Sequence, residues 1–237
     1  MLEVDLHVHS LFSRCGLHTV LELIAAAKNI GLKGFAVTDH GKTMGGRLTS
    51  VFFERFRSPE PSVRVFKGIE CNVTDSNGTI DIPYDYLPFM DIVLVGIHSN
   101  IERGQLREEY TSLLVKALEK NPMIDIVSHP NDPSYPVDYR LLAEAAALCG
   151  AALELNNSKV LYSRSPAEEA VAILEACKKT RCRIAVNSDT HAVHELGDDS
   201  AVAPLLEKVG FPRELIVNRD AEAAFAFIEE RRRFKQM

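Results

Sequence analysis

The sequence predicts an α/β fold in which about seven parallel strands and their helices form a distorted (β/α) barrel. Apolar runs too short to be helices recur along the chain, and each is followed by a polar segment and then by an amphipathic stretch. Histidines and carboxylates come directly after these runs. The ends of all the strands converge only when the strands circle one axis, whereas an open sheet gathers such groups from a few strands. The distribution therefore favours a barrel.

The expected strands are the short apolar runs, which occupy residues 4–7, 34–38, 63–69, 92–97, 124–128, 152–155 and 184–186. The expected helices are the amphipathic stretches at residues 20–30, 101–120, 139–148, 166–180, 200–209 and 221–234. Thr19, Asp138 and Ser165 are expected N-caps, and Gly31 and Gly150 stand where helices should end. No linker rich in proline, glycine or serine interrupts the alternation, so residues 1–237 are expected to form a single domain.

Composition and charge narrow the class of protein. The chain of 237 residues is 46% hydrophobic and 25% charged, which is ordinary for a globular protein with a sizeable core. Its net charge of −6 argues against binding a nucleic acid polymer, and the arginine run 231–233 is expected to be a solvated helix end. Five cysteines without a C-x-x-C pair indicate reduced thiols. No apolar leader precedes His7, so we expect a cytoplasmic protein without a membrane partner, of open oligomeric state.

The segment Asp5-Leu6-His7-Val8-His9 indicates a metal site. Side chains at i and i+2 of a strand leave on the same face, so His7 and His9 can reach one ion. Further residues of metal-binding type follow the other strands: His40, Glu70, His98, His129, Asp189 and His191. Neutral imidazoles with carboxylates suit Zn²⁺, Mn²⁺ or Fe²⁺, and more than four ligands imply more than one ion. Clustered divalent ions activate water for displacement at phosphorus, so the pattern predicts hydrolysis of a phosphate ester.

These motifs, in this order, resemble those of the PHP (polymerase and histidinol phosphatase) family, and in particular its small stand-alone bacterial phosphatases. They are Asp5-Leu-His7-Val-His9, Val37-Thr-Asp39-His40-Gly41, Gly68-Ile-Glu70, Gly96-Ile-His98, Val127-Ser-His129-Pro130 and Asn187-Ser-Asp189-Thr-His191. The resemblance covers nearly the whole chain, including Leu153-Glu-Leu-Asn156-Asn157-Ser158 and Ser163-Arg164. It implies a seven-stranded (β/α) barrel with a trinuclear metal site, often zinc, that hydrolyses phosphomonoesters.

The resemblance also implies which residues hold three divalent ions, with zinc favoured and manganese or iron as alternatives. His7, His9, Glu70 and Asp189 would bind the first ion, Glu70, His98 and His129 the second, and His40 and His191 the third. The implied catalytic residues are Glu70, Asp189 and His191. The resemblance also implies another third-ion ligand, usually histidine in the stand-alone phosphatases, at the position that Cys15 occupies here. A thiolate is a good zinc ligand, but His18 remains a competing candidate.

The substrate phosphate needs cationic or N–H donors opposite the metals. Arg164, in the family-like Ser163-Arg164, is the first candidate, and Lys42, Arg14 and Lys159 are weaker ones. Asp5 has two open roles: it could orient a ligating imidazole, or it could make a buried hydrogen bond of purely structural importance.

The leading prediction is a metal-dependent phosphomonoesterase acting on a small phosphorylated substrate. A nucleotide phosphodiesterase or exonuclease is an alternative, although the missing basic face argues against polymeric substrates. Histidinol phosphatase proper is another alternative, without an identifiable imidazole-specific pocket. A metal-stabilised regulatory module without turnover is the third, and it is disfavoured because Glu70 and Asp189 are both present.

Overall fold

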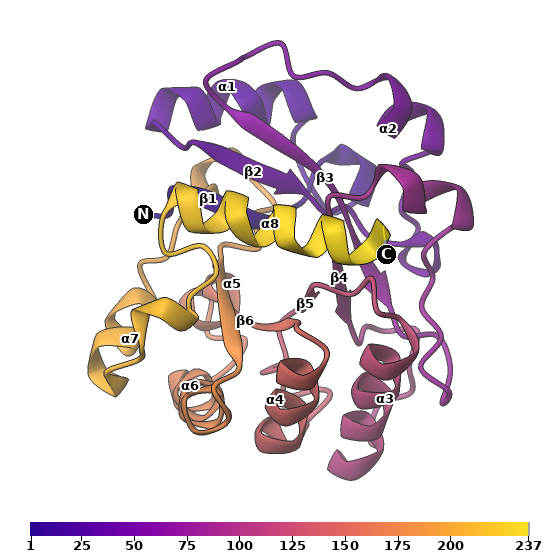
Figure 1. Ribbon diagram of the computed structural model, residues 1–237, viewed down its shortest axis with the longest axis vertical. Coiled ribbons are helices and arrows are strands. Elements are labelled where there is room, and N and C mark those ends of the chain that lie inside the picture. Colours follow the sequence, from indigo (N-terminus) through magenta and orange to yellow (C-terminus); the bar gives the residue numbers. More distant parts are fainter. Residues whose placement is uncertain (237) are drawn as a thin grey trace.

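Seven parallel strands form the core of the protein and follow one another around the sheet in the order β1-β2-β3-β4-β5-β6-β7 (Figure 1). The computed structural model describes residues 1–236. The strands are β1 (Val4–Val8), β2 (Gly34–Val37), β3 (Arg64–Asn72), β4 (Ile92–Gly96), β5 (Ile126–Val127), β6 (Ala152–Asn156) and β7 (Arg183–Asn187). The predicted distorted seven-stranded (β/α) barrel is confirmed.

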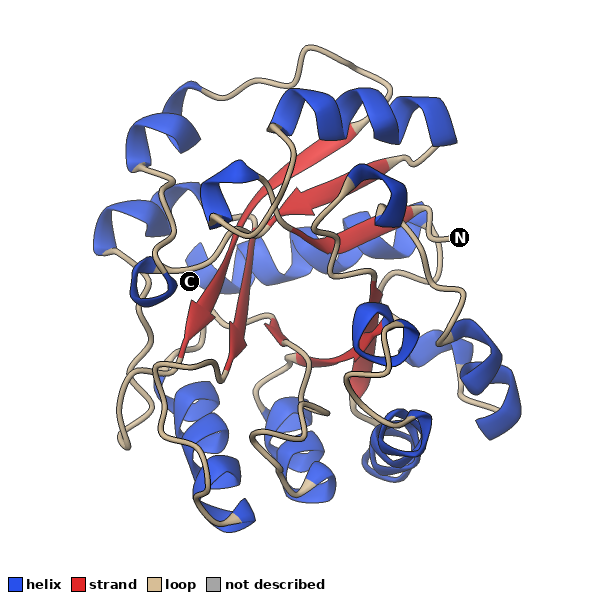
Figure 2. Ribbon diagram, turned by 180° about the vertical axis from the view of Figure 1, so that it is seen from behind, coloured by secondary structure: helices blue, strands red, loops and turns tan. Residues whose placement is uncertain are grey.

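Helices cover the outside of the barrel and one of its ends (Figures 1 and 2). They are α1 (Val20–Ile30), α2 (Ser50–Arg55), α3 (Arg107–Lys120), α4 (Tyr139–Leu148), α5 (Asn157–Leu161), α6 (Ala167–Thr180), α7 (Ala203–Val209) and α8 (Ala221–Gln236). Short 3₁₀ helices in the connections are η1 (Leu11–Ser13), η2 (Lys42–Met44), η3 (Tyr84–Phe89), η4 (Val193–Glu195) and η5 (Arg213–Leu215). Within residues 1–236, no helix combines the length and the apolar character that crossing a membrane requires.

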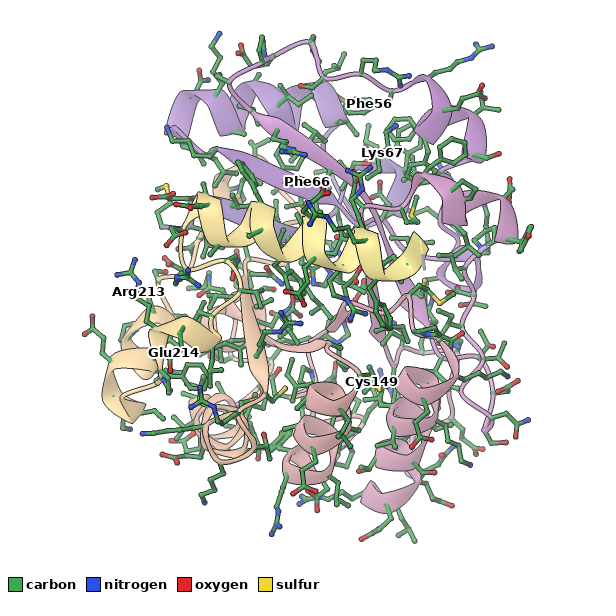
Figure 3. All side chains as sticks on the ribbon, in the orientation of Figure 1. Phe56, Phe66, Lys67, Cys149, Arg213 and Glu214 are labelled. Carbon is green, nitrogen blue, oxygen red and sulfur yellow. The ribbon has the colours of Figure 1, made fainter. Side chains whose placement is uncertain are left out.

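Helix α8 fills the amino-terminal end of the barrel. Inward-facing side chains of the strands, such as Leu6 and Phe66, form one buried cluster with Phe227 and Ile228 of α8. Phe66 lies beside α8 in Figure 3, and its ring centroid is 5.6 Å from that of Phe225. Because apolar side chains plug this end, polar chemistry is left to the carboxyl ends of the strands.

The seam between β1 and β7 is closed by individual hydrogen bonds and by two buried amide side chains. Near the carboxyl ends, the backbone N–H of His9 donates to the carbonyl of Thr190 at 2.9 Å. Closer to the amino-terminal end, the Asn187 side chain accepts the N–H of Leu6 at 3.1 Å, and the Asn218 side chain donates to the carbonyl of Val4 at 3.1 Å. The residues that follow β1 and β7 are therefore brought side by side.

Two helices begin and end at the predicted residues. Thr19 and Asp138 accept backbone N–H groups at the starts of α1 and α4, as N-caps do. Gly31, with φ of 78°, ends α1 in the left-handed conformation that favours glycine. Local sequence therefore determines these two helices.

Other boundaries differ from the prediction for local reasons. The helix expected at 101–120 begins only at Arg107, because Gly104 has φ of 84°, which no right-handed helix accepts. Ser165 is not an N-cap, since Pro166 takes that position before α6. Helices α2 and α5 were not predicted, because five or six residues are too few to show a helical period.

The expectation of a solvated arginine run is wrong for Arg231. Its side chain is only 3% exposed and donates to the Asp125 carboxylate at 2.8 Å and to the carbonyl of Ile124 at 2.8 Å. Arg233 follows the prediction, with a surface contact to Glu229. The difference arises because α8 crosses the end of the barrel and brings Arg231 over the start of β5.

Candidate metal centre

The residues predicted to bind metal come together at the carboxyl ends of the strands, the end of the barrel opposite α8. Glu70, near the end of β3, is fully buried at the centre of the group. Its two carboxylate oxygens lie 2.8–3.5 Å from imidazole nitrogens of His7, His9, His40, His98 and His129. One glutamate thus contacts side chains contributed by several different strand ends.

One part of the group surrounds Glu70 Oε2. The Nε2 atoms of His7 and His9 are 3.0 Å apart, and each lies 3.5 Å from this oxygen. Asp189 Oδ1 completes the cluster at 3.6 Å from His7 and 3.3 Å from His9. The expectation that His7 and His9 share a strand face is confirmed by these distances.

A second part surrounds Glu70 Oε1. His129 Nε2 lies 2.8 Å from this oxygen and His98 Nε2 lies 3.4 Å from it, while the Ser128 hydroxyl donates to it at 2.8 Å. His40 Nδ1 is 2.9 Å from Oε2, yet both of these buried atoms lack a hydrogen-bond partner of proper geometry. Two buried polar atoms that face each other without a hydrogen bond fit a cation as their common partner.

The third part lies at the mouth of the site. Ligand atoms of Cys15, His9 and His40 are within 4.8 Å of one another. Desolvation raises the pKa of the exposed Cys15 thiol, but hydrogen bonds with His191 and His40 outweigh it and lower the pKa to about 6. His18 lies elsewhere, with its Nδ1 4.0 Å from Glu22. The structure therefore places Cys15 beside the imidazoles, and places His18 in contact with the first turn of α1.

The electrostatics of the group suit cations. Among the described residues, Glu70 and Asp189 form ion-pair contacts with imidazoles only, and with no lysine or arginine. Burial raises the pKa of both carboxyls, but neighbouring imidazoles, His7 foremost, outweigh it and hold the pKa well below its usual value. Burial lowers the pKa of His9 to about 3, so this imidazole stays neutral. Burial would lower the pKa of His40 as well, but Glu70 foremost outweighs it and raises that pKa to about 10. Positive charge on such an imidazole balances the buried carboxylates, a role that divalent metal ions can take over.

Hydrogen bonds fix which imidazole nitrogens face the group. His9 Nδ1 lies 2.8 Å from the Ser13 hydroxyl oxygen, and Ser13 donates in turn to Asp39 at 2.5 Å. His191 Nδ1 lies 2.9 Å from the carbonyl of Asp189. In both cases Nδ1 carries the hydrogen, which leaves the Nε2 lone pair for a metal ion.

Glu154 of β6 has a part in the site that sequence reasoning did not assign. One of its oxygens accepts a hydrogen bond from His7 Nδ1 at 2.7 Å, and the other accepts the backbone N–H of His129 at 2.7 Å. Glu154 is fully buried. A glutamate inside the apolar run 152–155 was the available indication, since buried strands exclude carboxylates that have no partner.

Asp5 does not orient an imidazole. Its carboxylate accepts hydrogen bonds from the Ser188 hydroxyl and from the Gly197 N–H, the latter at 3.0 Å. The register of β1 against β2 shifts between Asp5 and Val8, so alternation along the strand does not carry through to His7. Of the two roles left open for Asp5, the structural one agrees with these contacts.

Two residues of the site have backbone conformations that favour glycine. The φ angles are 30° for His129 and 57° for Asp189. Such conformations cost about 1–3 kcal/mol each and persist where surrounding contacts enforce them. Gly96 is required for space rather than for backbone conformation. A Cβ at this position would lie 2.6 Å from Ser128 Oγ and 3.0 Å from the His129 ring.

Arg164 is connected to the site only through other side chains. It is exposed, and its guanidinium is 5.4 Å from the ring centroid of Tyr162. The Tyr162 hydroxyl donates to Glu195 at 2.6 Å, and Glu195 also accepts the N–H of His191 at 2.8 Å. The predicted phosphate-binding residue is thus linked to the site through two side chains and has no direct contact with the imidazoles.

The weaker phosphate candidates differ in availability. Lys159 forms an ion pair with Asp132 at 2.6 Å, and Lys42 donates to the carbonyl of Leu48 at 2.9 Å. Arg14 is exposed directly before Cys15, with φ of 68°. Two of the three cations are therefore already engaged within the protein.

The sequence comparisons agree with this geometry. The PHP domain model matches residues 5–158. A protein from Shewanella sediminis named probable phosphatase is 37% identical over 232 residues, covering 96% of this chain and 94% of that protein. Another probable phosphatase, from Acetivibrio thermocellus, is 34% identical over 232 residues, which cover 97% of this chain and 96% of that protein.

Solved structures show the same fold at lower identity. A chain of archaeal ribonuclease P with mature tRNA superposes with a TM-score of 0.64 at 16% identity, covering 99% of this chain and 93% of that chain. The histidinol phosphate phosphatase of Lactococcus lactis, solved with zinc, L-histidinol and phosphate, has a TM-score of 0.58 at 17% identity. The match covers 88% of this chain and 94% of that chain. On the family match and the nearly full-length relatives, this chain belongs to the PHP domain family.

Proposed function

We propose that this PHP-domain protein is a metal-dependent phosphatase that hydrolyses small phosphomonoesters at a site for three divalent ions, with zinc favoured over manganese or iron. The observation that carries the proposal is Glu70, a buried carboxylate contacted on both oxygens by imidazoles from several strands. A carboxylate placed in this way can join two ions. The phosphatase names of its full-length relatives support the same reaction class.

The proposed ligand sets are those that the family resemblance implies. The first ion would be held by His7, His9, Glu70 and Asp189, the second by Glu70, His98 and His129, and the third by Cys15, His40 and His191. His40 of the third set contacts Glu70 of the first set, with Nδ1 at 2.9 Å from Oε2, so the two sets are neighbours. No lysine or arginine among the described residues competes with cations for these carboxylates.

Divalent ions held by these residues would supply activation of the attacking water and neutralisation of charge on the phosphoryl oxygens. The protein's own residues prepare this chemistry. Glu70 and Asp189 remain ionised and so fix the negative charge that holds the ions. His191, 30% exposed at the mouth, is oriented by the Asp189 carbonyl through Nδ1, so its other ring nitrogen is the one that meets Cys15. Arg164 is the proposed partner of the substrate phosphate, since a guanidinium matches phosphate oxygens.

Glu70→Gln tests the proposal. A neutral amide binds cations poorly, so kcat toward a small phosphomonoester should fall more than tenfold, a barrier increase above about 1.4 kcal/mol. Glu222→Gln is the control, because Glu222 is exposed on α8 at the opposite end of the barrel. Retention of more than a tenth of wild-type kcat by Glu70→Gln would remove Glu70 from the proposed role.

A substrate panel separates the alternatives. The metal-loaded protein should hydrolyse p-nitrophenyl phosphate and sugar phosphates faster than bis-p-nitrophenyl phosphate or dinucleotides. Faster diester cleavage would instead indicate a phosphodiesterase. Absence of turnover on every substrate, with metal bound, would favour a regulatory module.

A further inference from the structure

Glu154 differs from Glu70 in how completely its oxygens are occupied. Oε1 accepts from His7 Nδ1 at 2.7 Å and from Asn187 Nδ2 at 2.8 Å. Oε2 accepts from the His129 N–H at 2.7 Å and from Asn156 Nδ2 at 2.9 Å. Two donors on each oxygen use the lone pairs of an ionised carboxylate. Glu154 therefore has no vacancy for a metal ion, although it is as buried as Glu70.

We propose that Glu154 is a positioning residue that couples occupation of the first and second metal positions. The proposal rests on the proposed function, because it takes His7 as a ligand of the first ion and His129 as a ligand of the second. One oxygen of Glu154 holds the ring of His7, and the other holds the backbone of His129. A single buried side chain thus sets both ligands.

At the first position, the contact determines the tautomer of His7. A hydrogen on Nδ1, donated to Glu154, leaves the Nε2 lone pair at 3.0 Å from His9 Nε2 and 3.5 Å from Glu70 Oε2. A carboxylate acceptor also increases the basicity of the metal-binding nitrogen. Without Glu154, His7 could carry its hydrogen on either nitrogen, and one of the two forms cannot ligate.

At the second position, the contact holds an unfavourable backbone. His129 has φ of 30°, a conformation that non-glycine residues avoid unless neighbouring contacts enforce it. Its N–H points to Glu154 Oε2, so relaxation of the backbone would break a hydrogen bond to a buried charge. In this conformation Nε2 of the His129 ring lies 2.8 Å from Glu70 Oε1.

Two asparagines that donate to Glu154 connect it to further residues of the first metal position. Asn156 Nδ2 donates both to Glu154 and, at 3.2 Å, to Asp189 Oδ2. Asn187 donates to Glu154 and accepts the N–H of Leu6. The carboxylate therefore joins β6 to the ends of β1, β5 and β7, and a change in it reaches ligands from three other strands.

Glu154→Gln is the test, because glutamine keeps the shape but replaces one acceptor oxygen with a donor. Zinc affinity, measured by competition with a chromophoric chelator, should fall ten- to a hundredfold for two equivalents, the usual effect of losing an orienting carboxylate. In the zinc-loaded protein, the ¹⁵N-resolved signal of the hydrogen-bonded His7 Nδ1–H should shift or disappear.

Asp125→Asn is the matched control. Asp125 is also a fully buried carboxylate, but it bonds Arg231 and Lys235 at the other end of the barrel. This variant should have a lower melting temperature and unchanged zinc affinity. If Glu154→Gln loses affinity only to the extent that Asp125→Asn does, Glu154 is merely structural. If only one zinc equivalent is weakened, the coupling is disproved.

The wild-type protein supplies an independent measurement should Glu154→Gln not fold. Addition of one zinc equivalent should already slow hydrogen exchange of the His129 amide, because the His7 side of Glu154 is then fixed. An amide that responds only to the second equivalent would overturn the coupling. If wild-type protein binds no zinc, the proposed function itself fails, which separates that outcome from failure of this inference.

Discussion

At the scale of single residues, Cys15 is where this chain departs from the ligand pattern that its family resemblance implies. Hydrogen bonds with His191 and His40 lower the pKa of its thiol to about 6 against the effect of desolvation. The lowered pKa favours the thiolate, which is the reactive and metal-binding form. The assignment of Cys15 as a third-ion ligand stays a prediction.

Alkylation tests this assignment. In the metal-loaded protein, Cys15 should resist iodoacetamide, and after chelation it should react quickly because the thiolate is released. Cys15→Ala should lose one metal equivalent and much of the rate, whereas Cys15→His should retain both. His18→Ala is the control and should be nearly silent. Equal metal content and rates in the two alanine variants would show that neither residue is a ligand.

Residues that contact the predicted ligands were harder to foresee than the ligands. His7 and His9 are visible in sequence because strand alternation alone puts them on one face. Glu154 and Ser13 act through hydrogen bonds to imidazoles from other strands, and such long-range partners have no local pattern. For Asp5 the sequence left two roles open, and the contacts decide for the structural one beside a register shift that no sequence rule predicts.

At the scale of elements, prediction succeeded where local capping decides and failed where tertiary contacts decide. Thr19 starts α1 by accepting a backbone N–H with its side chain, and Gly31 ends α1 by adopting a left-handed backbone conformation. The short helix α5 was missed although its N-cap Asn156 accepts the Lys159 N–H, because five residues are too few to show a helical period. Arg231 was misassigned because its burial depends on where α8 crosses the barrel.

Arg231→Met should destabilise the protein without affecting its metal site. The change leaves Asp125 buried with one cation fewer and removes donors from the carbonyls of Ile124 and Pro122. Loss of one partner of a buried pair costs about 3 kcal/mol or more of unfolding free energy. Urea unfolding of the metal-loaded protein measures this.

Arg233→Met serves as the control for that experiment. Its side chain is 76% exposed, so the unfolding free energy should change by no more than about 0.5 kcal/mol. Equal stability of the two variants would mean that the Arg231 contacts do not hold α8 in place. A parallel loss of zinc affinity in Arg231→Met would mean that the two ends of the barrel are not independent.

At the scale of the whole molecule, the barrel was predictable because polar residues follow every strand. The sequence could not show how the barrel closes. Few backbone bonds join β1 to β7, and Asn187 and Asn218 fill the seam with their side chains. The ligand candidates His9 and Asp189 lie on opposite sides of this same seam, 3.3 Å apart at their nearest atoms. Metal binding and barrel closure are therefore expected to be linked.

Metal content and metal removal test this link. The purified protein should contain more than one equivalent of divalent metal, because the predicted ligands exceed the four that one tetrahedral ion uses. Chelation should lower the melting temperature, since ligand at a thousandfold over its Kd contributes about 4 kcal/mol per site. Exchange of the His9 and Thr190 amides, which bond across the seam, should rise more than that of the β3–β4 pair. One ion or fewer per chain, or uniform exchange after chelation, would contradict a multinuclear site that closes the barrel.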